Sequence, residues 1–375
     1  MSRIGFVKLL AVLVLTIGSN ELWASIVYQY VGNCRAGALP TITAALAATP
    51  QPNVVKICPG TYPEQVHITY AVTLQGMTSG NSGEVIIASP PNGLVVNATD
   101  DFGEAIAADI FVDVLPAPFT ISDITVDAAN NHVMPPAYVA GIFVKNSPGT
   151  VNHVTTRNQM GGDGGVGIWL EGGALLPAIT VENSSIHDFD LYGVWTQTNA
   201  AASQLTATIS GNDVNGSFPG GPAGTQQTGI VINSGATNTV KGNVVAGLGT
   251  GIWSKGSATG TISGNTLLDD STGILLDAGG VSATGNKIYD TCPGGTSSSC
   301  QGIQINSAVP AVQGNTIFNS PVGIEFNCIA NPNVHSNTIT DGTTGLDQVP
   351  AGIASPNSFY DVFTERAGCA AGATH

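Results

Sequence analysis

The segment Gly229–Gly273 contains a short repeat that constrains the fold more than any other feature of the chain. Two lines of 22 residues align, GIVINSGATNTVKGNVVAGLGT and GIWSKGSATGTISGNTLLDDST. Each begins with Gly-Ile-x-aliphatic and reaches Gly-Asn-x-aliphatic before it returns to glycine. A unit this short cannot bury an apolar face alone, so it must stack on copies of itself. We therefore expect a solenoid in which each repeat forms one coil.

Aligning the repeats places three kinds of residue in columns. The glycine column is Gly141, Gly167, Gly193, Gly229, Gly251, Gly273, Gly302, Gly323 and Gly345. The asparagine column is Asn152, Ser184, Asn212, Asn243, Asn265, Asn286, Asn315 and Asn337. A turn column is Asp188, Asp269, Asp290, Asn319 and Asp341. Asn tolerates left-handed backbone conformations and its amide can bond to the same amide one coil away, while Asp and Asn close turns. We interpret all three columns as architecture.

The composition is consistent with a stacked array. Charged residues make up 9% of the chain and glycine is abundant, but the regular Ile, Val and Leu spacing supplies a core and argues against disorder. The net charge of −15 would repel phosphate backbones, so no nucleic-acid partner is expected. A polyuronate would be repelled as well, unless a bridging cation or a local basic cluster intervenes. A neutral glycan faces no such barrier.

The N-terminus has the pattern of an export signal. Arg3 and Lys8 precede the apolar run Leu9–Ile17, which is too short for a stable membrane span. We predict a signal peptide over residues 1–24, with a retained anchor as the alternative. Secretion or export to a periplasm is expected, with no membrane span in the mature chain.

Six cysteines lie beyond the predicted signal, and an even count in an exported protein favours disulfides. Many pairings are open, and we predict the nearest-neighbour one: Cys34 with Cys58, Cys292 with Cys300, and Cys328 with Cys369. No Cys-x-x-Cys or His/Cys metal spacing occurs in the sequence, so a structural zinc site is not expected.

The N-terminal part carries a family resemblance. The segments TITAAL, VVKICPGTYPEQVHI and VTLQGM, within residues 41–77, resemble the opening of pectinesterase-type and pectin-lyase-like right-handed parallel β-helix proteins. The resemblance implies a capping helix followed by the first coils. The sequence lacks the pectinesterase, polygalacturonase and alginate-epimerase motifs that carry catalysis, so the likeness concerns the fold and not a reaction.

The predicted fold is therefore all-β, a single-stranded right-handed parallel β-helix of about 22-residue coils with a short N-terminal capping helix. The helix is predicted at Thr41–Ala48. The domain would cover residues 25–375, with an N-terminal cap over 25–60, coils over 61–345 and a C-terminal cap over 346–375. We expect a monomer.

An aromatic column marks the candidate binding face. In Gly-Ile-x-aliphatic, alternation points x outward. Reading x along the coils gives Phe143, Trp169, Trp195, Val231, Trp253, Leu275, Gln304 and Glu325. An exposed aromatic row at coil spacing would suit sugar rings, so the predicted partner is a polysaccharide or glycan bound along Phe143, Trp169, Trp195 and Trp253. The alternative is that the rings stack on one another beneath loops of the same coils.

Insertions and polar residues gather in the same coils. Extra length falls in residues 157–166, 172–177, 197–204, 215–228 and 292–300. The candidate catalytic residues are His187, Asp188, Asp190 and Arg157, which could cleave a glycoside through paired carboxylates or remove the C5 proton of a uronate. His153 and Asp213 are further candidate substrate contacts, predicted about 10 Å apart. Asp163, Asp188 and Asp190 could hold Ca²⁺, which is the candidate cofactor. The competing interpretation is solvated turn residues.

Three functions remain open from the sequence. The first is a secreted carbohydrate-binding protein, with polysaccharide lyase or glycoside hydrolase activity as the catalytic form. The second is a non-catalytic surface or adhesion protein that binds through the same aromatic row. The third is a purely structural β-helix. Long insertions and the acidic turn favour the first, and the missing family motifs favour the second.

Overall fold

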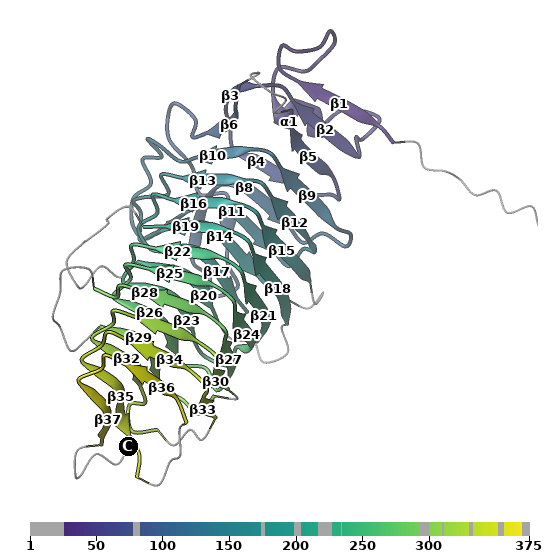
Figure 1. Ribbon diagram of the computed structural model, residues 1–375. Helices are drawn as coiled ribbons and strands as arrows, with labels where there is room; N and C mark the ends of the chain where they lie inside the picture. The colour runs from purple at the N-terminus through teal and green to yellow at the C-terminus, as the bar shows by residue number, and fades with distance from the viewer. Residues whose placement is uncertain are drawn as a thin grey trace, which may run out of the picture.

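A computed structural model shows one continuous stack of coils (Figure 1). The structure describes residues 26–77, 83–173, 177–198, 204–216, 227–233, 235–292, 300–309, 311–329, 333–351 and 356–369. The predicted signal peptide, and most of the insertions at 172–177, 197–204, 215–228 and 292–300, lie outside these residues. None of the described helices has the length and hydropathy needed for a membrane span.

Each coil contributes one strand to each of three parallel sheets, which confirms the right-handed parallel β-helix. Sheet A contains β1 (Tyr28–Val31), β2 (Val54–Ile57), β5 (Thr73–Gly76), β9 (Phe119–Ser122), β12 (Gly149–Asn152), β15 (Ala178–Glu182), β18 (Leu205–Ser210), β21 (Ala236–Lys241), β24 (Thr259–Ser263), β27 (Gly280–Thr284), β30 (Val312–Gln313) and β33 (Val334–His335).

Sheet B contains β3 (Gly60–Pro63), β6 (Val85–Ala88), β10 (Thr125–Asp127), β13 (Thr155–Arg157), β16 (Ser185–His187), β19 (Asp213–Asn215), β22 (Val244–Ala246), β25 (Thr266–Leu268), β28 (Lys287–Tyr289), β31 (Thr316–Phe318), β34 (Thr338–Thr340) and β36 (Ser358–Tyr360).

Sheet C contains β4 (Val66–Ile68), β8 (Ala105–Asp113), β11 (Tyr138–Lys145), β14 (Gly165–Glu171), β17 (Tyr192–Gln197), β20 (Thr228–Ile232), β23 (Thr250–Ser254), β26 (Thr272–Leu276), β29 (Gln301–Ile305), β32 (Val322–Glu325), β35 (Thr344–Val349) and β37 (Thr364–Gly368). A short strand, β7 (Ala98–Thr99), pairs antiparallel with β8.

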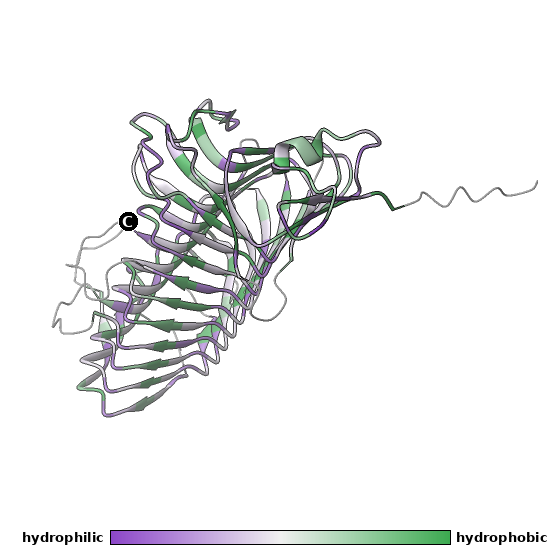
Figure 2. Ribbon diagram, turned by 90° about the horizontal axis from the view of Figure 1, so that it is seen from above, coloured by the Kyte–Doolittle hydropathy of each residue, from purple (hydrophilic) through white to green (hydrophobic). Residues whose placement is uncertain are grey.

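The core lies inside the coils. Alternate residues of all three sheets point inward, and the resulting rows of Ile, Val and Leu form one cluster that runs from the first coil to the last. Figure 2 shows these apolar positions recurring along the stacked strands of successive coils. Because each coil buries its apolar side chains against its neighbours, no single coil could be stable alone.

The glycine column is confirmed, and its cause is close backbone contact. A Cβ added at Gly141, Gly229 or Gly251 would lie 2.7 Å from the carbonyl oxygen of the next glycine in the column. Stacked strands pass one another at this bend with no room for a side chain. In the coil that precedes Gly141, the equivalent position is occupied by Asp109. Its carboxyl group is fully buried, and this burial raises its pKa.

The asparagine column forms a buried ladder. Each amide donates to the Oδ1 atom of the next asparagine, at 2.9 Å from Asn243 to Asn265 and again from Asn265 to Asn286. The ladder begins at Ser184 and extends to Asn357. The prediction was wrong at one end: Asn152 pairs in register with Glu182 and stands outside the ladder. These bonds satisfy backbone N–H and C=O groups at the turn between sheets A and B, and so fix the stacking of the coils.

The turn column is also confirmed. Asp188, Asp269, Asp290, Asn319 and Asp341 all have left-handed backbones, with φ between 52° and 57°. Asp and Asn reach this region more readily than other non-glycine residues. These positions close the turn from sheet B to sheet C.

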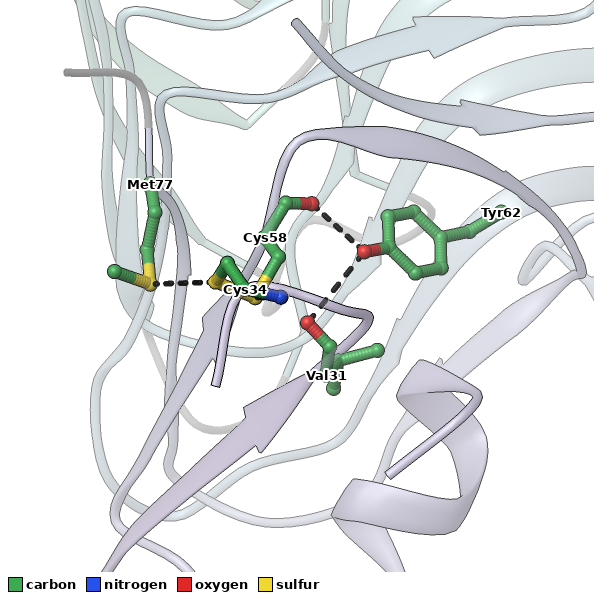
Figure 3. Close-up of a disulfide and its surroundings, with 5 residues drawn as sticks. All are labelled: Val31, Cys34, Cys58, Tyr62 and Met77. Carbon is green, nitrogen blue, oxygen red and sulfur yellow. Dashed lines mark hydrogen bonds between the residues drawn. A yellow bond between two sulfur atoms is a disulfide. The ribbon is translucent and has the colours of Figure 1, made fainter. Parts of the chain in front are cut away.

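The N-terminal end of the stack is covered by α1 (Ile42–Leu46), which lies within the predicted helix. Thr41 Oγ1 caps the helix by accepting a bond from Ala44 N, and Ile42 packs into the end of the core. Figure 3 shows the adjacent Cys34–Cys58 disulfide, where the Tyr62 hydroxyl donates to Cys58 O at 2.7 Å. The helix and the disulfide together cover an end that would otherwise expose unpaired backbone groups.

The predicted cysteine pairing is confirmed at all three disulfides. At the C-terminal end, β36 and β37 continue sheets B and C past the predicted start of the cap. The Cys328–Cys369 disulfide joins the residue after β37 to an earlier coil. These two strands therefore form a further partial coil within the predicted cap.

Candidate functional site

The aromatic column lies on the outer face of sheet C and is longer than predicted. The strand register adds His67 and Phe111 before Phe143, and it continues to Asp347 after Glu325. The full column is His67, Phe111, Phe143, Trp169, Trp195, Val231, Trp253, Leu275, Gln304, Glu325 and Asp347. The predicted order of side chains is therefore confirmed, and their exposure decides what they can bind.

The upstream part of the column is buried, which corrects the predicted exposure. Phe143 and Trp169 are both 0% exposed, and Phe111 is 6% exposed. We call these three side chains the buried aromatic row. Their rings contact one another at centroid distances of 5.4 Å, and they pack with Ala98 of β7 into a second apolar cluster outside the coils. Phe143 and Trp169 thus fit the alternative of roofed packing.

A segment between β6 and β8 folds back over this row. We call residues 97–104 the outer excursion. Asp101 N donates to Glu171 Oε1 at 2.8 Å, and the Lys145 ammonium contacts Asp101 Oδ1 at 3.0 Å and Thr99 O at 2.7 Å. Gln197 Nε2 donates to Asp100 Oδ2 at 3.1 Å. Polar residues of β11, β14 and β17 therefore hold the excursion down over the aromatic side chains.

Among the residues that hold the outer excursion, Glu171 has a strongly raised pKa. It is 0% exposed, and Lys145 Nζ lies 3.8 Å from its Oε2 atom. Burial raises its pKa to about 7, against the hydrogen bond from Asp101 N, which lowers it. A pocket of about 580 Å³ opens beside Lys145, lined also by Phe111 and Asp113.

Downstream, the column is partly open. Tyr192, Trp195 and Trp253 are partly exposed on the outer face of sheet C, and the Lys255 ammonium lies among their rings. We call these four residues the aromatic patch. The distance from Lys255 Nζ to the ring centroid is 4.4 Å for Trp253, 5.7 Å for Tyr192 and 5.9 Å for Trp195. Burial among the rings lowers the pKa of Lys255.

Neighbouring contacts hold the patch in place. Trp195 stacks on Trp169 of the buried row at 4.2 Å, and Tyr192 meets Trp195 edge-on at 5.0 Å. Trp253 Nε1 donates to Asp277 Oδ2 at 2.6 Å, while the other oxygen of Asp277 accepts from Asn306. The rings are therefore fixed before any ligand arrives, which reduces the entropy cost of binding.

Three of the four predicted catalytic residues lie together at the edge between sheets B and C. Arg157 ends β13, and His187 ends β16 one coil further on. Arg157 Nε donates to Asp127 Oδ2 at 2.8 Å, and His187 Nδ1 lies 2.7 Å from Asp188 Oδ2. Burial alone would raise the pKa of Asp127, but bonds from Asn158 and Arg157 lower it. We call Asp127, Arg157, His187 and Asp188 the edge cluster.

The predicted calcium site does not form. Asp190 accepts hydrogen bonds from the backbone N–H groups of Gly161 and Gly165, so its carboxylate closes the loop between β13 and β14. Asp163 lies near the Tyr138 hydroxyl, and Asp188 pairs with His187. Over the ranges described above, no three His, Cys, Asp or Glu side chains are arranged to hold a metal ion. Asp163 lies in the loop that Asp190 closes, but the Asp190 carboxylate is bonded to backbone N–H groups and Asp188 is paired with His187.

His153 and Asp213 do not share a column. His153 occupies the left-handed turn position before β13, with φ of 52°, whereas Asp213 pairs with Ser185 at the start of β19. His153 instead lines a pocket of about 350 Å³ with Glu84 and Asp123. The predicted distance of about 10 Å between His153 and Asp213 was based on an alignment in which Asn152 was placed in the wrong column.

Sequence reasoning missed Lys255, Glu171 and Lys145. All three occupy the outward position two residues after the aromatic column, since Lys145 pairs with Glu171 and Lys255 follows Trp253 by two. Alternation along the strands would have placed them on the same face. Alternation would not have found Tyr192, because it lies three residues before Trp195 and is therefore expected on the opposite face, yet its ring contacts that of Trp195.

A family model described as the right-handed β-helix region matches residues 197–358. No curated protein matches the sequence closely enough to show a relationship. Among solved structures, the fold is similar to a lacto-N-biosidase from Eubacterium ramulus, with 13% identity and a TM-score of 0.51 over 92% of this chain and 68% of that one.

Two other solved structures are similar at lower scores. An alginate lyase from Paenibacillus has 12% identity and a TM-score of 0.47 over 92% of this chain and 99% of that one. A DFA-IIIase from Arthrobacter chlorophenolicus has 13% identity and a TM-score of 0.44 over 92% and 86%. Together with the three parallel sheets, the family model and the first structure show that the fold is a right-handed parallel β-helix.

Proposed function

We propose that this protein is exported and binds a glycan along the outer face of sheet C, at the aromatic patch. The observation that carries the proposal is the fixed, partly exposed arrangement of Tyr192, Trp195 and Trp253 around the Lys255 ammonium. Ligand sites combine apolar and aromatic surface with a few placed polar groups, and the patch has both.

The spacing of the patch supports a chain of sugar rings as its ligand. Adjacent coils are about 4.8 Å apart, and Val231 lies between Trp195 and Trp253 in the column, so these two rings are about 9.6 Å apart, roughly the length of two sugar residues. Tyr and Trp present flat apolar faces together with a polar atom, as a sugar ring does. The lacto-N-biosidase with the similar fold acts on a carbohydrate according to its name, which agrees with this ligand class.

Export is supported by the cysteines. The described cysteines are all in disulfides, and disulfides persist in oxidising compartments outside the cytosol. The N-terminal signal pattern points the same way. A net charge of −15 favours a neutral glycan over a polyanionic one at long range.

Cleavage of the bound glycan is the second candidate function, and the edge cluster favours it. Arg157, His187 and Asp188 bring a cation, an imidazole and a carboxylate to one edge of the same coils. Those groups suit proton transfer in a lyase or a hydrolase. Asp190 is less suited to the predicted catalytic role because its carboxylate is bonded to backbone N–H groups.

The decisive experiment is a glycan array combined with product detection on the same oligosaccharides. We expect binding by the wild type and loss of binding in Trp253→Ala and Trp195→Ala. Phe318→Ala is the matched control, because Phe318 is a 38% exposed aromatic on sheet B. Unchanged affinity of both Trp variants for every glycan would contradict the proposal.

Product analysis then separates the catalytic and non-catalytic forms. New reducing ends would indicate hydrolysis, and unsaturated products would indicate a lyase. Either activity should be lost in His187→Ala if the edge cluster is catalytic. Binding with no new product would assign the protein to the non-catalytic adhesion class.

A further inference from the structure

The outer face of sheet A carries an uninterrupted row of threonines that the glycan site does not use. In strand register, seven threonines and one serine follow one another from β5 to β27: Thr73, Thr120, Thr150, Thr180, Thr208, Thr239, Thr261 and Ser282. The ladders between β15 and β27 run without a register shift, so the hydroxyl and methyl groups repeat at the strand spacing of about 4.8 Å.

A second threonine row runs beside the first. Thr206, Thr237 and Thr259 pair with one another on β18, β21 and β24. Each lies two residues before a member of the first row, so three successive coils read Thr-Ala-Thr, Thr-Asn-Thr and Thr-Gly-Thr. Two residues of a strand span about 6.6 Å, and both threonines of each pair point outward. The face is therefore a two-dimensional array, which we call the threonine array.

The array is open to solvent. Thr206, Thr237, Thr259 and Thr261 are exposed, and the other members from Thr73 to Ser282 are partly exposed. The hydroxyl groups of the longer row form no hydrogen bond within the described residues; in the shorter row, Thr237 and Thr259 contact each other at 3.2 Å. No charged residue lies within either row, and Glu182 and Lys241 border the longer row on one side.

Strand propensity alone does not explain this regularity. Threonine is favoured in strands generally, yet the corresponding outward column on sheet B is mixed. That column reads Thr155, Ser185, Asp213, Val244, Thr266, Lys287, Thr316 and Thr338. The same coils therefore carry a charged, irregular outer column on one sheet and an uncharged, periodic one on the next.

The chemistry of the array fits a periodic, uncharged ligand made of hydrogen-bonding oxygen atoms. Each threonine offers a hydroxyl group that can donate or accept a hydrogen bond, with an apolar methyl group beside it. Water oxygens on the faces of ice repeat on a rectangular net of dimensions comparable to the coil and strand repeats. The buried asparagine ladder keeps the coils in register, so the array is rigid before contact.

We propose that the outer face of sheet A binds ice, through the threonine array on β15, β18, β21, β24 and β27. This site is independent of the proposed glycan site, which lies on sheet C. Its consequence is that the protein adsorbs to ice crystals and arrests their growth.

The test uses the full folded chain in an assay of ice recrystallisation and crystal shape. We expect the wild type to inhibit recrystallisation and to facet the crystals. Thr261→Lys should abolish both effects, because a long charged side chain in the array prevents close contact. The matched control is Thr266→Lys on β25, in the same coil but on sheet B, where Lys287 already occupies the next place in the column. It should retain full activity.

Several outcomes would overturn the inference. If the wild type inhibits recrystallisation no more than serum albumin at equal concentration, the protein does not bind ice. If Thr261→Lys and Thr266→Lys lose equal amounts of this activity, ice does not bind at the outer face of sheet A. If Thr261→Lys fails to fold, as judged by circular dichroism, Thr208→Lys on β18 gives the same test. A dimer that becomes a monomer in Thr261→Lys, or adsorption to crystalline cellulose without any effect on ice, would assign the array to another occupant.

Discussion

The upstream and downstream halves of the outer face of sheet C carry the same sequence pattern and have different environments. In β11 and β14 the outward aromatics Phe143 and Trp169 are completely buried, whereas in β17 and β23 the equivalent Trp195 and Trp253 are partly exposed. The difference comes from the outer excursion, which is fastened to Lys145 and Glu171. An outward position on a solenoid is therefore a potential binding site only where nothing folds back over it.

The comparison also separates two roles for one residue type. Tryptophan in the buried aromatic row fills space between the coils and the excursion, and so contributes to stability. Tryptophan in the aromatic patch leaves a face available and is expected to contribute to ligand binding. Substitutions at matched positions can separate these roles.

The largest expected effect is that of Trp169→Ala. Removing a fully buried indole from the second apolar cluster should lower the free energy of unfolding by about 3–5 kcal/mol. Trp253→Ala, at the equivalent position three coils away, should lower it far less, since its ring is partly exposed. Chemical denaturation of both variants measures this, and similar losses in the two would remove the distinction between the halves.

A pH-dependent effect is expected from Glu171. Its pKa is about 7 in the folded protein, against 4.5 for an unperturbed Glu. The folded state holds this proton more tightly than the unfolded state. The contribution to stability is therefore fully present below about pH 4.5 and is lost as pH rises to about 7, on the order of 3 kcal/mol in total.

Glu171→Gln should remove that part of the pH dependence. The amide keeps an oxygen for the Asp101 N–H, has no proton to lose, and leaves Lys145, Asp100 and Asp101 in place. Unfolding free energies of wild type and variant at intervals from pH 4 to pH 8 give the difference curve. A flat curve across this range would contradict the burial of an ionisable group beneath the excursion.

The smallest effect is expected from Lys255→Met. Methionine keeps the apolar stem against the rings and removes the ammonium, so the cost to stability should be about 0.5–1 kcal/mol, the size of a partly exposed cation–π interaction. Glycan affinity should fall several-fold if the ammonium contacts the ligand. Titration calorimetry measures the affinity, and Lys287→Met on sheet B is the control.

Much of the fold could be predicted because the same structural requirement recurs at the same position of every coil. Gly251 is required by the carbonyl of Gly273, Asn265 by Asn286, and Asp269 by a left-handed turn, so each appears as a column. The sheet register follows from this local logic, whereas the capping helix was implied by a family resemblance and the cysteine pairing was predicted from proximity in the sequence. Asn152 is the exception among the column residues. It is an asparagine like the others, but its pairing with Glu182 shows that it does not belong to the asparagine column.

The candidate site was less predictable because it depends on segments that break the repeat. The aromatic order along sheet C follows from alternation in the sequence, and so does the threonine array on sheet A. Whether a side chain is covered depends on residues far away in the chain: Asp101 reaches Glu171 across 70 positions, and Gln197 reaches Asp100 across 97.

The sequence by itself therefore determined the coil, its three faces and the residue types on each, since these are set by periodic, short-range requirements. Only the tertiary structure decided which part of the aromatic column is buried and that Lys255 lies among three rings. It also decided that Asp190 is bonded to backbone N–H groups and that Asp188 is paired with His187. The physical reason is that burial and charge pairing depend on contacts between non-repeating segments, and no local pattern encodes those contacts.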